Sequence, residues 1–289
     1  MLKVTLLGTG SPEPRANRHG SAHLVQADGE YLLFDCGPGA TQRLAATDIP
    51  ITEIDFQFFT HHHYDHNVDF AQFALVRWDQ GAGRTTPLQI YGPSGTERYV
   101  ERLFGPQGAF EPDIVARTKH PVSIDMYRWR GGEGDRQPIA LGAKDVQPGI
   151  ICAGPTWQVT AAPAVHAQPY HDCLSYRVDC DGGSVVITGD TIPCRSTINL
   201  ARDVDLLLHM SPDRKNWDDP ISGRRFATFG PSDLSKAAAE SGAKKLVIVH
   251  MMGNAWDDPA ETQKILDEIS SIYDGKIVLG EDLMEVTPD

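Results

Sequence analysis

The sequence predicts an α+β fold, a four-layer αββα sandwich in which two mixed β-sheets pack face to face with helices outside. Both halves of the 289-residue chain present short apolar strand segments followed by helical segments, as this layering requires. No low-complexity linker divides the halves. A chain of this length buries roughly three-quarters of its surface on folding, so its core needs no disulfide. We therefore expect one domain over residues 1–289.

The first half contains strands that end at turn-forming residues. Asp28-Gly29 favours a tight hairpin, and Gly92-Pro93 marks a turn that leads into a helix. The predicted strands are 3–7, 22–26, 31–35, 54–60 and 88–91, and the predicted helices are 67–78 and 95–104.

The composition changes between residues 105 and 154. Gly, Pro and charged residues accumulate there, and the sequence RGGEGDRQP has the weakest structural signal. We expect this segment to be an insert within the domain, or a lid. In the second half the predicted strands are 157–161, 174–179, 184–188, 204–209 and 245–250, and the predicted helices are 232–241 and 259–273.

The charge balance favours a small substrate. The chain has 26 Lys+Arg and 39 Asp+Glu, a formal net charge of −13, whereas proteins that bind nucleic acid usually carry a basic stripe. Nucleic acid is therefore an unlikely partner. The sequence is compatible with a homodimer.

The cysteines and the N-terminus predict a cytoplasmic protein. Five cysteines without a CxxC pair fit a reducing compartment. The first residues, MLKVTLLGTG, form an apolar strand and a turn rather than a signal peptide. No apolar run approaches the roughly 18 residues that a membrane span requires, so we expect no membrane partner.

The segment THHHYDH at 60–66 is the strongest chemical signal, because four histidines and an aspartate follow directly after a predicted strand. Imidazole and carboxylate groups together suit zinc or a similar divalent metal. If the chain stays extended, His61, His63 and Asp65 lie on one side, and His66 begins the next helix. In the alternative the segment is helical and pairs His62 with His66. A histidine-rich surface loop without metal is the other interpretation.

Isolated ligand-type residues follow three later strands. His166 follows WQVTAAPAV, Asp190 follows SVVITG, and His250 follows KLVIV. Each alone is also compatible with a structural or capping role. Because all of them end strands, we expect them to complete a metal site with the residues of THHHYDH.

The pattern of His61, His63, Asp65, His66, His166, Asp190 and His250 resembles the metallo-β-lactamase superfamily of dinuclear metal hydrolases. GTGSPEPRANRHG, LLFDCGPGATQRL and ITGDT are most similar to the branch that holds ribonuclease Z and arylsulfatase-like enzymes. The resemblance implies one metal on His61, His63 and His166, a second on Asp65, His66 and His250, and Asp190 between them. Zinc is the default ion, with manganese or iron as alternatives.

The resemblance also implies the chemistry. Two divalent ions lower the pKa of a shared water, so that a metal-bridging hydroxide attacks the ester. Asp65 is the candidate that orients the hydroxide or accepts its proton. His209, after the strand VDLLL, is either a proton donor to the leaving group or a buried core histidine. Asp35 is either a residue that orients a ligand or a strand-end turn residue.

We expect a metal-dependent hydrolase of a small ester, with sulfate or phosphate esters favoured. The alternatives are a ribonuclease Z-like endonuclease that processes the 3′ end of tRNA, a lactone or amide hydrolase, and a metal-containing protein that binds a ligand without catalysis. Three departures from the branch bear on the choice: Tyr64 replaces a small residue, Asp69 replaces a glycine, and Met210 replaces an acidic residue.

Overall fold

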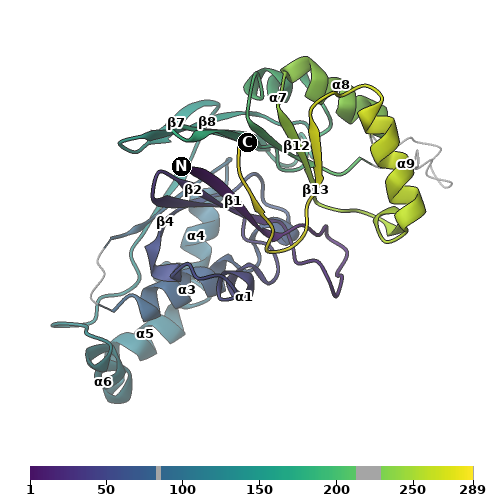
Figure 1. The fold of residues 1–289 in the computed structure, drawn as a ribbon. Helices are drawn as coiled ribbons and strands as arrows, with labels where there is room; N and C mark the ends of the chain where they lie inside the picture. Colours follow the sequence, from purple (N-terminus) through teal and green to yellow (C-terminus); the bar gives the residue numbers. More distant parts are fainter. Residues whose placement is uncertain (83–85, 213–228, 289) are drawn as a thin grey trace.

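Two seven-stranded sheets form the centre of the molecule (Figure 1). The structure, a computed structural model, describes residues 1–82, 86–212 and 229–288. The first sheet has the order β14 (Glu285–Val286), β1 (Leu2–Gly8), β2 (Ala22–Ala27), β3 (Glu30–Phe34), β4 (Ile54–Phe58), β5 (Leu88–Gly92) and β6 (Leu141–Asp145). The second sheet has the order β13 (Lys276–Leu279), β12 (Lys245–Val249), β11 (Leu206–Met210), β10 (Gly183–Ile187), β9 (Leu174–Cys180), β8 (Trp157–Pro163) and β7 (Gly149–Ala153).

Both sheets are mixed. β1, β2 and β3 pair antiparallel, whereas β3 to β6 run parallel. The predicted hairpin joins β2 to β3, and Asp28 and Gly29 both have positive φ angles, of 50° and 98°, as a tight two-residue turn requires. In the second sheet β10, β11, β12 and β13 are parallel. The carboxyl ends of β10, β11 and β12 therefore meet at one edge of that sheet.

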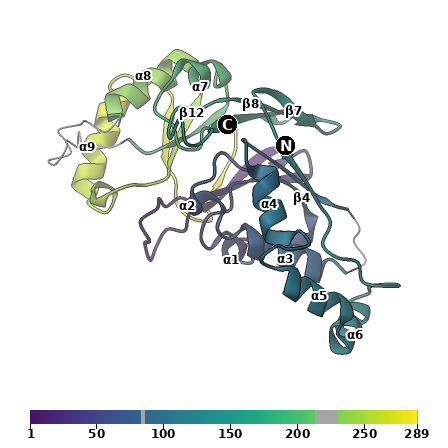
Figure 2. The same ribbon diagram turned by 180° about the vertical axis from the view of Figure 1, so that it is seen from behind.

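Apolar side chains fill three layers. One cluster lies between the sheets and includes Phe34, Phe58 and Tyr176, whose rings contact one another. A second cluster joins the outer face of the first sheet to helices, and a third does the same for the second sheet. The helices of the first sheet are α1 (Ala40–Leu44), α3 (Phe70–Gln80) and α4 (Thr96–Phe104), and those of the second are α7 (Arg195–Leu200), α8 (Pro231–Ser241) and α9 (Pro259–Ser270). The predicted αββα sandwich is confirmed, and Figure 2 shows it from behind.

The predicted helix at 67–78 is interrupted. A short helix α2 (Tyr64–Asn67) precedes α3, and Asp69 lies at the break between them. The Asp69 carboxylate accepts a hydrogen bond from the backbone N–H of Thr41, 2.6 Å away, and so ties this break to α1. Asp69 thus has a structural partner that a glycine at this position lacks.

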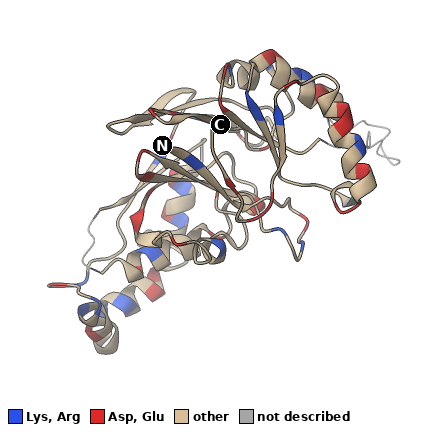
Figure 3. Cartoon of the chain, in the orientation of Figure 1, with Lys and Arg blue, Asp and Glu red and all other residues tan. Residues whose placement is uncertain are grey.

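The segment 105–154 divides into two parts. Its end forms β6 and β7, the edge strands through which the chain crosses from the first sheet to the second. Its beginning forms α5 (Glu111–Lys119) and α6 (Pro121–Trp129), which project from the sandwich (Figure 1). Acidic and basic residues are intermixed along these helices (Figure 3). The part that leaves the sheets therefore carries no single-sign surface, and its function as a lid stays a prediction.

Asp79 at the end of α3 holds this projection. Its carboxylate lies 2.9 Å from Arg117, 2.6 Å from Arg130 and 2.6 Å from Arg136. The Arg136 guanidinium also lies 4.3 Å from the centre of the Trp78 ring. A polar cluster thus joins the sandwich to α5 and α6.

Among the described residues, no helix combines the length and the apolar character that crossing a membrane requires.

Candidate metal centre

The structure brings together all seven predicted ligand residues at the ends of strands. They form two groups in which the candidate ligand atoms lie within 4.8 Å of one another. The open group consists of His61, His63, His166 and Asp190, and the closed group consists of Asp65, His66 and His250. His61 follows β4 of the first sheet, whereas His166, Asp190 and His250 follow β8, β10 and β12 of the second. Each group therefore draws on both sheets.

The loop after β4 is extended as far as His63 and then becomes helical. The backbone of His63 has φ −70° and ψ 149°, and α2 begins at the next residue. His61 and His63 accordingly share one group, as an extended chain predicts. Asp65 lies within α2, so the helical turn directs it to the closed group instead.

His62 points away from both groups. Its Nε2 lies 2.8 Å from the Thr96 hydroxyl at the start of α4, and its ring lies 5.6 Å from that of Tyr99. The alternative in which His62 and His66 form a helical pair is therefore wrong. His62 therefore has a structural role in packing the loop against α4. The sequence indicates this only through its position between His61 and His63, since an extended chain directs it to the opposite side.

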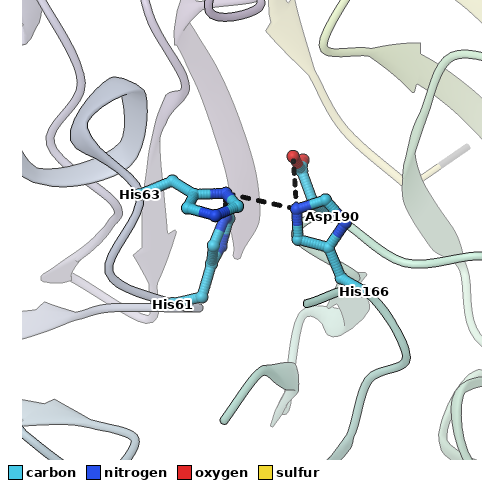
Figure 4. Close-up of side chains that lie close together, drawn as sticks. All are labelled: His61, His63, His166 and Asp190. Atoms are coloured by element: carbon cyan, nitrogen blue, oxygen red, sulfur yellow. Dashed lines mark hydrogen bonds and ion pairs between the residues drawn. The ribbon is translucent and has the colours of Figure 1, made fainter. Parts of the chain in front are cut away.

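The open group contains converging imidazole nitrogens (Figure 4). His63 Nδ1 lies 3.0 Å from His61 Nε2 and 3.2 Å from His166 Nε2, and Asp190 Oδ2 lies 3.7 Å from His166 Nε2. Burial and the neighbouring imidazoles lower the pKa of His61, His63 and His166. These rings are therefore neutral at pH 7, which is the form that binds a metal.

The closed group is buried. His250 Nε2 lies 3.2 Å from Asp65 Oδ2, and Asp190 Oδ1 lies 3.3 Å from His250 Nε2 and 3.4 Å from His66 Nε2. The Asp190 carboxylate thus faces both groups, one oxygen toward each. Burial raises the pKa of Asp190, but His250 and His66 outweigh burial and hold it well below the usual value.

The unsatisfied polar atoms of this region fit a cation. Asp65 Oδ1, His66 Nε2 and Asp190 Oδ1 are buried without a hydrogen-bond partner among the described residues. Burial disfavours the charged form of His66, yet Asp190 and Asp35 outweigh it and raise the pKa of His66 well above its usual value. The carboxylates therefore favour positive charge at this position. Histidine nitrogens and carboxylate oxygens are a donor set for divalent transition metals, so the residues present fit the metals that the sequence predicts.

Asp35 orients one of these side chains. Its Oδ2 lies 2.7 Å from His66 Nδ1, and its Oδ1 accepts a hydrogen bond from the Thr60 backbone N–H, 2.8 Å away. The contact with Nδ1 leaves His66 Nε2 directed at Asp65 and Asp190. Asp35 has a φ angle of 58°, and His250 has one of 53°. Such left-handed conformations are costly for residues other than glycine and cluster at functional sites.

His209 lies outside both groups. Its Nδ1 lies 2.9 Å from the carbonyl oxygen of Met210, and its ring contacts Phe229 at a centroid distance of 5.3 Å. The ring also lines a small cavity with residues of α7 and α8. The backbone N–H of Thr191 donates a hydrogen bond to the Met210 sulfur, 3.2 Å away. The structure thus gives His209 core contacts, and its function as a proton donor stays a prediction.

A two-sheet sandwich with paired histidine and carboxylate groups at its strand ends defines a metal-dependent hydrolase of the metallo-β-lactamase fold. Residues 30–251 match the family described as beta-lactamase superfamily domain, and the chain belongs to this superfamily.

Known relatives extend over the whole chain. A ribonuclease Z from Mycolicibacterium gilvum is 30% identical over 292 residues, which cover 99% of this chain and 96% of that protein. A ribonuclease Z from Mycobacterium bovis is 31% identical and covers 99% of this chain and 98% of its own.

Solved structures share the fold at lower identity. The metallo-beta-lactamase fold protein YhfI from Bacillus subtilis superposes with a TM-score of 0.70 at 20% identity and covers 99% of this chain and 98% of its own. The short form of human tRNase Z has a TM-score of 0.67 at 20% identity and covers 99% of both chains.

Proposed function

We propose that this chain is a dinuclear metal-dependent phosphodiesterase whose first candidate substrate is RNA. The observation that carries the proposal is full-length similarity, at 30–31% identity, to proteins named ribonuclease Z, together with two ligand groups that Asp190 contacts on both sides. This similarity opposes the expectation, drawn from a net charge of −13, that nucleic acid is an unlikely partner.

The open and closed groups would hold one cation each, with zinc as the first ion to test. Bound together, two divalent cations supply a water of lowered pKa and neutralise the charge that develops on the phosphoryl oxygens. Asp190 faces both groups and would keep the two ions close. Asp65 Oδ1, which has no partner among the described residues, is the acceptor for the proton of the attacking water.

Substrate would approach from the open group. The His166 side chain is 29% exposed, whereas the His66 and His250 side chains are 1% and 3% exposed. His63 is half-buried and lies beside His166. The exposed imidazoles therefore mark the side at which a phosphodiester reaches the centre.

Hydrolysis of a small ester is the second candidate. Met210 stands where the ribonuclease Z branch has an acidic residue, and its thioether contacts Thr191. His209 consequently lacks a neighbouring carboxylate at that position. The intermixed charges of α5 and α6 also offer no basic stripe for the phosphates of an RNA.

The test compares two substrates with the same zinc-loaded protein. We expect cleavage of a precursor tRNA at its 3′ side, with activity lost after chelation and restored by zinc. Turnover of bis(p-nitrophenyl) phosphate without tRNA cleavage would favour the small-ester candidate. His63→Ala is the inactive control, and Glu285→Gln, a surface carboxylate paired with Lys3, is the matched active control.

A further inference from the structure

Two exposed tyrosines lie in the segments that carry His63 and His166 of the open group. Tyr64 lies between His63 and Asp65 in the sequence, and Tyr170 follows His166 by four residues. Tyr64 is 59% exposed and Tyr170 is 90% exposed. Single exposed apolar side chains are common on protein surfaces, so their exposure alone indicates nothing. Their position beside the exposed ligands is the informative feature.

The two loops that carry these tyrosines meet at His63. The His63 ring lies 5.0 Å from the ring of His166 and 5.0 Å from that of His171, the residue after Tyr170. Two further apolar residues of these segments are exposed: Val165, next to His166, at 43%, and Val68, four residues after Tyr64, at 54%. Exposed aromatic or apolar side chains therefore occur in both loops that carry imidazoles of the open group.

The Tyr64 ring is held in place by a hydrogen bond. Its hydroxyl donates to the carbonyl oxygen of Pro12 at 2.9 Å. The loop that contains Pro12 is itself anchored, because the Met251 backbone N–H donates to the Thr9 carbonyl at 2.8 Å, next to His250. A ring that is already fixed loses little conformational entropy when a ligand stacks on it.

The Tyr170 loop is closed at its base. The Ala164 N–H donates to the Cys173 carbonyl at 2.9 Å, and the Gln168 side chain donates to the Ala164 carbonyl at 2.8 Å. Within it, the Tyr170 N–H donates to the Ala167 carbonyl at 3.0 Å. Tyr170 thus lies in a loop whose base and turn are fixed by hydrogen bonds.

We propose that Tyr64 and Tyr170 form an aromatic rim that binds a flat aromatic group next to the scissile bond of a phosphoester. This proposal rests on the proposed phosphodiesterase function. Stacking on an aromatic side chain accepts an aryl ring or a nucleobase, because both present a π face. The rim therefore determines which phosphoesters bind, while the metal centre determines which bond breaks.

The experiment varies the group that stays on phosphorus and keeps the leaving group constant. The zinc-loaded protein is assayed with the methyl, phenyl and thymidine-5′ esters of p-nitrophenyl phosphate. We expect KM for the phenyl and thymidine esters to be roughly tenfold lower than for the methyl ester, with a smaller change in kcat. A low KM for the phenyl ester alone indicates that the rim accepts aryl esters. A low KM for both the phenyl and the thymidine ester indicates that it also accepts nucleotides.

Three variants assign this preference to the rim. Tyr64→Leu and Tyr170→Leu should each reduce the ratio of KM values several-fold, whereas Tyr64→Phe, which keeps the ring, should retain most of it. Trp129→Leu is the matched control, because Trp129 is 77% exposed on α6, away from the metal centre. Thermal melting and zinc content show that each variant is folded and loaded.

The rim is overturned if wild type turns over all three esters with equal KM, or if both leucine variants keep the full preference. If the proposed phosphodiesterase function is wrong, the result is different, because the protein then cleaves neither the three esters nor tRNA. In that case calorimetry with phenylphosphonate and methylphosphonate still tests the rim. Tighter binding of phenylphosphonate that Tyr64→Leu abolishes supports it, and equal binding overturns it.

Discussion

The open and closed groups contain the same kinds of side chain but differ in their access to solvent. Asp65, His66 and His250 are buried, and Asp35 fixes the His66 ring from behind. In the open group His166 is exposed and His63 is half-buried. The two groups thus divide into a closed group that is buried and an open group that reaches solvent through His63 and His166.

The largest expected effect concerns Asp190, which faces both groups. Asp190→Asn should lower kcat/KM by at least about 10³-fold, because one change removes the negative charge that faces both cation positions and replaces one of its oxygens by an amide nitrogen. Elemental analysis should show less than two zinc ions per chain. Asp179→Asn, at a surface carboxylate paired with Arg177, is the control. Full zinc content and near-normal activity in Asp190→Asn would contradict the shared position.

The second prediction compares how much a histidine of each ligand group contributes to the stability of the fold. In the metal-free protein, His66→Ala should lower the free energy of unfolding by about 3 kcal/mol, because it leaves buried carboxylates without their partner and opens a cavity. His166→Ala should change it by less than about 0.5 kcal/mol, since that ring is partly in solvent. Urea unfolding after chelation measures both, and equal effects would refute the division.

The third prediction concerns His209, a buried histidine outside both groups, and the dependence of stability on pH. Burial lowers the pKa of His209 from 6.5 to about 4. As pH falls below 6.5, the unfolded chain binds a proton that folded His209 does not. The contribution of His209 to the free energy of unfolding is therefore fully present above pH 6.5. It decreases as the pH falls from 6.5 to 4, by up to about 3 kcal/mol.

The measurement for His209 is the pH dependence of unfolding in wild type and His209→Leu. The variant should lose less stability between pH 7 and pH 4 than wild type does. Its kcat is a second readout, because a core histidine predicts a small change and a proton donor predicts a loss of roughly 10²-fold or more. Identical pH profiles would exclude a buried neutral His209.

The smallest expected effect lies at the projection formed by α5 and α6. Burial raises the pKa of Asp79, but hydrogen bonds from Arg136 and Arg130 outweigh it and lower the pKa. Asp79→Asn should therefore cost about 1 kcal/mol at pH 7, with the cost fading as pH falls through the folded pKa. It should also speed proteolysis within 105–140 while bis(p-nitrophenyl) phosphate turnover stays constant. A loss of turnover would show that the projection supports the metal centre.

The sequence predicted which residues converge at the strand ends because these residues obey one physical rule. An apolar run becomes a buried strand, and the first polar residues after it lie at the sheet edge, where strands from both halves end. His166, Asp190 and His250 follow this rule and meet the residues of THHHYDH. His209 is expected to follow its strand, but β11 extends through it to Met210, and its ring lines a cavity with residues of α7 and α8.

Other features depend on contacts that no local pattern contains. β6 and β7 are half-exposed edge strands in a segment rich in Gly and Pro, so their apolar periodicity is weak. Asp65 leaves the side of His61 and His63 because α2 begins at Tyr64, and the Cys36 N–H donates to the His66 carbonyl within this turn. Such bonds between distant segments decide the local backbone after the chain has folded.

Each group takes side chains from loops of both sheets, so a bound ion would act as a crosslink between the two halves of the sandwich. Ions that bind only the folded chain stabilise it by mass action. The edge where the loops meet would then have the highest local stability in the metal-bound protein. It would also be the first region to lose stability when a chelator removes the ions. Removal of the ions would thereby lower the stability of the fold as well as any activity that depends on them.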